Sequence, residues 1–90
     1  MRAAIYDRYW HSMGGGERHS GMIAEVLSKD GVEVDLIGHS QVDRDELAEH
    51  LGLDLSRTRM RTVPDKGDAY VAALSSEYDL FVNATYMSVV

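Results

Sequence analysis

The sequence of 90 residues contains no cysteine. Neither a disulfide nor a thiolate metal site can therefore support its fold. No apolar run approaches the ~20 residues that a membrane-spanning helix needs. The apolar start at residues 3–6 is interrupted by Asp7 and is too short for a secretory signal. From these absences we expect, by default, a cytoplasmic chain without a membrane span.

Basic residues are also few. Nine Lys and Arg stand against fifteen Asp and Glu, which gives a formal net charge of −6. A nucleic-acid partner requires a basic face that replaces phosphate counterions, so the charge argues against DNA and RNA. The 44% hydrophobic share indicates a folded chain rather than a disordered one. The length allows at most one small domain.

Short apolar runs alternate with segments of helical periodicity along the whole chain. The continuous apolar run from Ala3 to Tyr6 is typical of a strand that is covered on both faces of a parallel sheet. The pattern predicts strands near residues 2–6, 32–37, 59–63 and 79–83, with helices at 17–29, 43–51 and 68–77 between them. This alternation predicts an α/β fold, with a partial Rossmann-like parallel sheet, strand order 3-2-1-4 and helices on its faces.

The two outer strands of this predicted sheet differ in character. Arg59 and Arg61 alternate with neutral residues on the third strand, as expected of an edge strand that avoids pairing with other chains. The fourth strand, Leu80 to Val82, is apolar and would form the opposite edge. We therefore expect that further chain belongs beside it, or that the chain self-associates through this strand.

Ligands of open parallel sheets bind outside the carboxyl ends of the strands. Three predicted loops leave this edge: residues 7–16, 38–42 and 84–86. The first ends in Gly14-Gly15-Gly16 directly before a helix, where free N–H groups and the helix dipole favour a phosphate. Three glycines also suit a tight turn without any ligand, and both interpretations stay open. His39, at the end of the second strand, is the histidine best placed for function.

Two familiar phosphate-binding patterns do not fit. The chain has no G-x-x-x-x-G-K-[ST] segment, which argues against a P-loop. His19 occupies the third position of a dinucleotide fingerprint that would begin at Gly14, and no acidic residue follows the second strand for a ribose. Dinucleotide binding is therefore disfavoured.

Other candidate residues have simpler explanations. Tyr9 and Trp10 suit sugar rings, but we favour a role in anchoring the first loop. The four histidines lack metal-ligand spacing, so we expect no metal site. Three arginines, Arg57, Arg59 and Arg61, could clamp an anion, although a solvated strand face explains them as well. No general base or cofactor is identifiable.

Several segments have the same order in a known family. They are Gly14-Gly15-Gly16-Glu17-Arg18, Ile23 to Leu27, Gly31 to Val34, Leu51 to Leu55 and Tyr78 to Asn83. Together they resemble the start of family 4 glycosyltransferases, which have the GT-B fold of two Rossmann-like domains facing across a cleft. The resemblance covers nearly the whole chain and implies that residues 1–90 are the first, incomplete part of a GT-B amino-terminal domain.

The resemblance also implies a function. In that family the glycine turn lies against the diphosphate of a nucleotide-sugar donor, and the amino-terminal domain mainly holds the acceptor. The second domain holds most of the nucleotide, and this sequence has no room for it. We therefore expect a glycosyltransferase fragment that is inactive alone, with Gly14, Gly15, Gly16 and His39 as substrate-binding residues. The alternative is a non-catalytic α/β module that binds a phosphorylated ligand or a partner chain.

Overall fold

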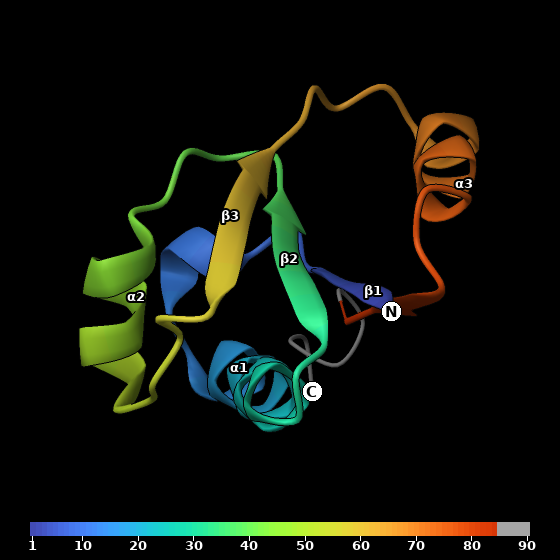
Figure 1. Ribbon diagram of the computed structural model, residues 1–90. Helices are drawn as coiled ribbons and strands as arrows, with labels where there is room; N and C mark the ends of the chain where they lie inside the picture. Colours follow the sequence, from blue (N-terminus) through green and yellow to red (C-terminus); the bar gives the residue numbers. More distant parts are fainter. Residues whose placement is uncertain (85–90) are drawn as a thin grey trace.

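A computed structural model of the chain describes residues 1–84 (Figure 1). Four strands and three helices alternate: β1 (Arg2–Tyr6), α1 (Gly15–Lys29), β2 (Glu33–Gly38), α2 (Arg44–Leu51), β3 (Thr58–Thr62), α3 (Asp68–Ser75) and β4 (Leu80–Asn83). A 3-10 turn, η1 (Trp10–Ser12), lies between β1 and α1. The strands form one parallel sheet in the order β3-β2-β1-β4. The predicted fold class and strand order are confirmed.

Helices cover both faces of the sheet, with α1 and α2 on one face and α3 on the other (Figure 1). Alternate residues of each strand face the two helix layers, because side chains of a strand point to opposite sides. Ala3 and Ile5 of β1 pack with the α1 and α2 layer, whereas Ala4 and Tyr6 pack with α3. The sheet therefore divides two small cores, and no helix in the described part of the chain is long and apolar enough to cross a membrane.

The first helix begins two residues earlier than the pattern predicts. Gly14 is the N-cap residue, and Gly15 and Gly16 form the start of the first turn rather than a loop before it. Glu17 makes this early start possible, because its Oε1 accepts a hydrogen bond from the Gly14 N–H at 3.2 Å. The other predicted boundaries agree with the structure to within two residues.

Helix ends follow the signals in the sequence. Gly31, just beyond α1, and Gly52, at the end of α2, have φ angles of 87° and 70°, where a side chain would be strained. Asp43 caps α2, because its Oδ1 accepts hydrogen bonds from the N–H groups of Asp45 and Glu46 at 2.8 and 3.0 Å.

A glycine inside α1 makes room for the last residue of α2 and for a leucine just beyond that helix. A Cβ on Gly21 would lie 2.7 Å from Leu53 Cδ1 and 3.4 Å from Leu51 Cδ1. This close approach explains a residue that otherwise weakens a helix.

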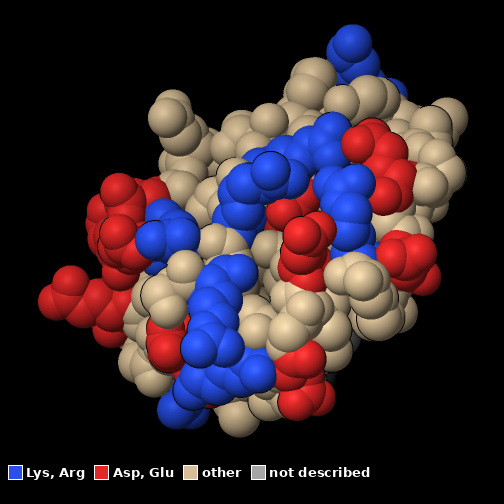
Figure 2. Space-filling model, viewed as in Figure 1, with Lys and Arg blue, Asp and Glu red and all other residues tan. Residues whose placement is uncertain are grey.

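A polar network covers the sheet beside α3. Asp35 of β2 is buried, and its carboxylate accepts two hydrogen bonds from Arg59, at 3.1 and 2.9 Å, and one from Tyr78 Oη at 2.6 Å. Arg61 pairs with Glu77 at 3.1 Å. Figure 2 shows that basic side chains run across the face over β2 and β3, with acidic side chains beside them. The arginines of the edge strand therefore hold the chain's own carboxylates.

Candidate functional site

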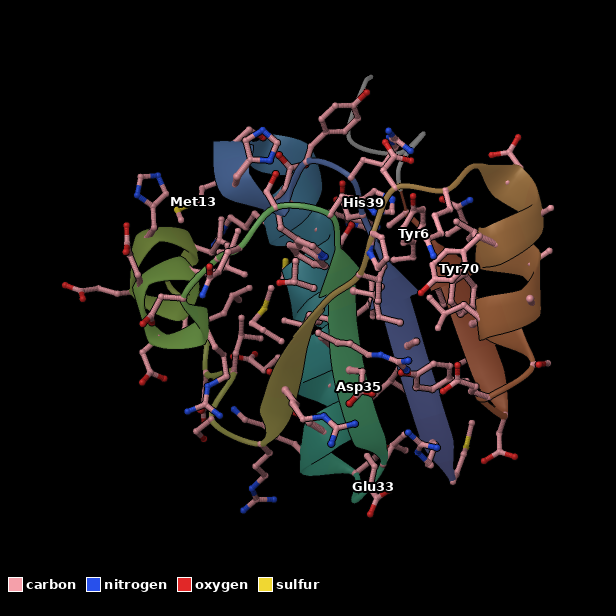
Figure 3. The ribbon with its side chains drawn as sticks, turned by 90° about the horizontal axis from the view of Figure 1, so that it is seen from above. Tyr6, Met13, Glu33, Asp35, His39 and Tyr70 are labelled. Carbon is pink, nitrogen blue, oxygen red and sulfur yellow. The ribbon has the colours of Figure 1, made fainter. Side chains whose placement is uncertain are left out.

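The carboxyl ends of the strands carry the residues that the sequence singles out. In Figure 3, Tyr6 and His39 lie together near this edge, whereas Asp35 lies midway along β2 and Glu33 near its start. The edge has two parts: the first turn of α1 on one side of the sheet, and a polar cluster beside α3 on the other.

The first turn of α1 presents free backbone donors. The first intrahelical hydrogen bond runs from the Arg18 N–H to the Gly14 carbonyl at 3.0 Å. Within residues 1–84, no oxygen accepts from the N–H groups of Gly15, Gly16 or Glu17. A Cβ on Gly15 would have no atom within 4 Å. The turn is thus open to a ligand that accepts hydrogen bonds, and packing within the described chain does not require glycine at position 15.

Glu17 limits the number of backbone N–H groups at this turn that a ligand can use. Its side chain is only 2% exposed, and its Oε1 bonds the Gly14 N–H and the Ser12 hydroxyl. Among the residues described, its Oε2 has no hydrogen-bond partner. Since the Gly14 donor is already used and Glu17 is almost fully buried, an anion at this turn would meet the amides of Gly15 and Gly16 first.

Trp10 fixes the loop that leads to this turn. The side chain is 1% exposed, and its Nε1–H donates to the Ile37 carbonyl at 3.1 Å. Gly38 leaves room for the ring, because a Cβ there would lie 3.1 Å from Trp10 Cδ1 and from the Asp7 carbonyl oxygen. Trp10 therefore anchors the loop, as favoured from the sequence, whereas Tyr9 is 41% exposed.

His39 is held between two partners. Its Nδ1 lies 3.0 Å from the Val63 carbonyl, which can only accept, so Nδ1 carries the proton. Its Nε2 lies 2.6 Å from Tyr6 Oη and accepts the phenolic proton when the ring is neutral. Burial is the main cause that raises the pKa of Tyr6. The histidine is thus fixed in one tautomer at the end of β2.

An ion pair lies beside Tyr6 and His39. Arg8, in the loop after β1, donates from Nη1 to Asp65 Oδ1 at 3.3 Å and from Nη2 to Asp65 Oδ2 at 2.5 Å. The hydrogen bonds from Arg8 lower the pKa of Asp65 and are the largest cause that raises the pKa of Arg8. His39 Nε2 is 3.9 Å from Asp65 Oδ1, and Arg8 Nη1 is 3.5 Å from Tyr6 Oη. The pair joins the loops that leave β1 and β3.

The sequence located part of this edge. Gly14, Gly15, Gly16 and His39 all lie at the carboxyl ends, but the glycines open α1 on one side and His39 bonds Tyr6 on the other. Tyr6, Arg8 and Asp65 were missed. The signal for the first two was their position at the end of a buried strand. The third predicted loop, residues 84–86, lies outside the described residues except for Ala84.

Comparison with known proteins does not identify a family: no family model, no curated protein and no solved structure matches the chain. In the described part of the chain, no three His, Asp or Glu side chains are arranged to hold a metal ion. The class that the structure defines is an α/β chain with a Rossmann-like parallel sheet.

Proposed function

We propose that this chain is the amino-terminal part of a glycosyltransferase of family 4, which transfers a sugar from a nucleotide-sugar to an acceptor hydroxyl. The amides at the start of α1 face the donor diphosphate and stabilise the charge that develops as it leaves. The chain alone is inactive, because donor binding and exclusion of water require a second domain.

One observation carries the proposal: the open first turn of α1. Three consecutive N–H groups without acceptors among residues 1–84 stand at the edge where parallel sheets bind ligands. The glycine at position 15 has empty space where a side chain would stand. A diphosphate supplies acceptor oxygens for these amides and gains from the positive end of the helix dipole.

A second candidate rests on the same turn. A small α/β module without catalytic activity would use these amides for a phosphate monoester. The two candidates differ in whether a diphosphate attached to a nucleotide and a sugar is preferred over a monophosphate.

Titration of the isotopically labelled chain with UDP-glucose and GDP-mannose, followed by amide NMR, tests the proposal. We expect the largest shifts at the amides of Gly15, Gly16 and Glu17, with weak, millimolar binding because a second domain holds most of the nucleotide in enzymes of the proposed family. Glucose 6-phosphate should shift the same amides less. Equal or larger shifts with glucose 6-phosphate favour the binding module.

The variant Gly15→Val tests whether the ligand binds at the amides of the first turn of α1. The new side chain meets nothing within the described chain, so the fold should persist while the approach to the amides is blocked. Ala69→Val is a matched control, since Ala69 is also exposed in the first turn of a helix. Gly15→Val should weaken nucleotide-sugar binding at least ~5-fold and Ala69→Val should not. Equal binding by all three folded proteins would contradict the proposed function.

A further inference from the structure

The first turn of α1, which we propose faces the donor diphosphate, is one part of the carboxyl edge. The other part is a cluster of four side chains, Arg8, His39, Tyr6 and Asp65. These four side chains come from β1, from the end of β2 and from the loops after β1 and β3. Such convergence from several strand ends is typical of a ligand site in a parallel sheet. The cluster also contains a group that donates hydrogen bonds to anions, the Arg8 guanidinium, whereas the Tyr6 hydroxyl donates to His39 Nε2 when the ring is neutral.

The Asp65 carboxylate shows what this cluster can hold. Both of its oxygens accept from the two terminal nitrogens of Arg8, which is the arrangement by which arginine binds phosphate and carboxylate groups. His39 Nε2 faces one of the same oxygens at 3.9 Å. The carboxylate thus occupies a position where a small anion would meet an arginine and a histidine.

Asp65 is suited to leave that position. It lies in an exposed loop between β3 and α3, and its side chain is 48% exposed. Arg8 is 39% exposed, so a ligand can reach the pair from solvent. An ion pair at this exposure holds its partners only weakly, because water solvates both charges well. Tyr6 and His39, in contrast, are buried or nearly so and stay fixed.

We propose that Arg8, positioned beside the Tyr6–His39 pair, binds the anionic group of the acceptor, a phosphate or a carboxylate, and that Asp65 occupies this site when no acceptor is bound. The acceptor class is therefore a sugar or polyol that bears a negative charge near its reacting hydroxyl. This inference rests on the proposed function for the identity of the ligand as an acceptor. Binding of the anion itself does not depend on that function.

Three compounds that share a three-carbon skeleton test the site: glycerol 3-phosphate, glycerate and glycerol. We expect the phosphate and the carboxylate to shift the side-chain NMR signals of Arg8 and His39, and uncharged glycerol to leave them unchanged. The stronger of the two anions identifies the charged group. Shifts confined to the Gly15, Gly16 and Glu17 amides would overturn the inference, because the anion would then bind at the helix turn.

Two variants distinguish an anion-binding site from an ion pair that has only a structural role. Asp65→Asn removes the competing carboxylate and should tighten glycerol 3-phosphate binding ~2- to 5-fold, whereas Arg8→Gln should weaken it at least ~10-fold. Asp45→Asn is the matched control: Asp45 also pairs with a partly exposed arginine, Arg44, at 3.0 Å, and its replacement changes the net charge equally.

An affinity in Asp65→Asn that equals the wild type, or that rises no more than in Asp45→Asn, would overturn the proposal. Wild-type affinity in folded Arg8→Gln would do so as well. Failure of the proposed function appears separately, as the absence of nucleotide-sugar shifts at Gly15, which leaves the Arg8 measurements unaffected.

Discussion

Two glycines of α1 should respond in opposite ways to the same substitution. Replacement of a helical glycine by alanine stabilises a protein by about 0.4–1 kcal/mol when the site has room, chiefly because the unfolded chain loses freedom. Gly15 has room, since its Cβ would have no neighbour within 4 Å. Gly15→Ala should therefore raise the free energy of unfolding by up to ~1 kcal/mol.

Gly21 has no such room. The Cβ of Gly21→Ala would lie 2.7 Å from Leu53 Cδ1 and 3.4 Å from Leu51 Cδ1. Overpacking of this kind typically costs about 1–3 kcal/mol. Leu53 is half-buried, so its side chain can relieve part of this overlap. After the gain of up to ~1 kcal/mol from helix propensity, we expect a net loss of about 0–2 kcal/mol.

Urea unfolding of the wild type and both variants measures these changes, and thermal melts should follow at about 4–8 °C per kcal/mol for a chain of this size. Adding Leu53→Ala to Gly21→Ala should recover part of the loss, as a favourable coupling of at least ~0.5 kcal/mol in a double-mutant cycle. The reasoning is refuted if Gly21→Ala stabilises the protein as much as Gly15→Ala.

Two further predictions concern the polar network and the open strand. The hydrogen bonds from Arg59 and Tyr78 outweigh the effect of burial and lower the pKa of Asp35, so the network stabilises the fold above pH ~4 and its contribution is lost as the pH falls through the lowered pKa. Tyr78→Phe should cost about 0.5–1.5 kcal/mol at pH 7 and less at pH 2, as measured by urea unfolding; an equal loss at both pH values would contradict this. Separately, the purified chain should turn over no nucleotide-sugar and should scatter light as a species larger than its 10.0 kDa monomer, because one side of the apolar β4 is open within the described residues. Leu80→Lys should reduce that mass, while Val26→Lys, at a 62% exposed apolar residue of α1, should not; a wild-type monomer, or dissociation by Val26→Lys instead, would show the strand prediction to be wrong.

The sequence predicted the fold well because each element carried its own local signal. The continuous apolar runs identified strands covered on both faces, and the alternation with helical periods left few topologies open. Gly31 and Gly52 marked helix ends that need a positive φ. The start of α1 was placed too late, because three glycines favour a loop by propensity and only the contact from Glu17 to the Gly14 N–H overrides it.

The candidate site was less predictable because it depends on contacts between distant segments. The sequence was sufficient to locate the first turn of α1 and His39, because both follow predicted strands. The pairing of Arg8 with Asp65 spans 57 positions and is formed only when the ends of β1 and β3 flank that of β2. Likewise, Arg59 and Arg61 appeared to be solvated edge charges, and nothing local indicated that Asp35 and Glu77 would hold them.

The anchoring of the first loop by Trp10 has a spectroscopic consequence. The chain contains one tryptophan, and that indole is buried at the ligand edge with its N–H on the Ile37 carbonyl. Its intrinsic fluorescence therefore arises from a single environment, between the loop after β1 and the end of β2. A native emission maximum at short wavelength reports that this loop is seated, so the molecule carries an optical reporter of its own candidate site without any label.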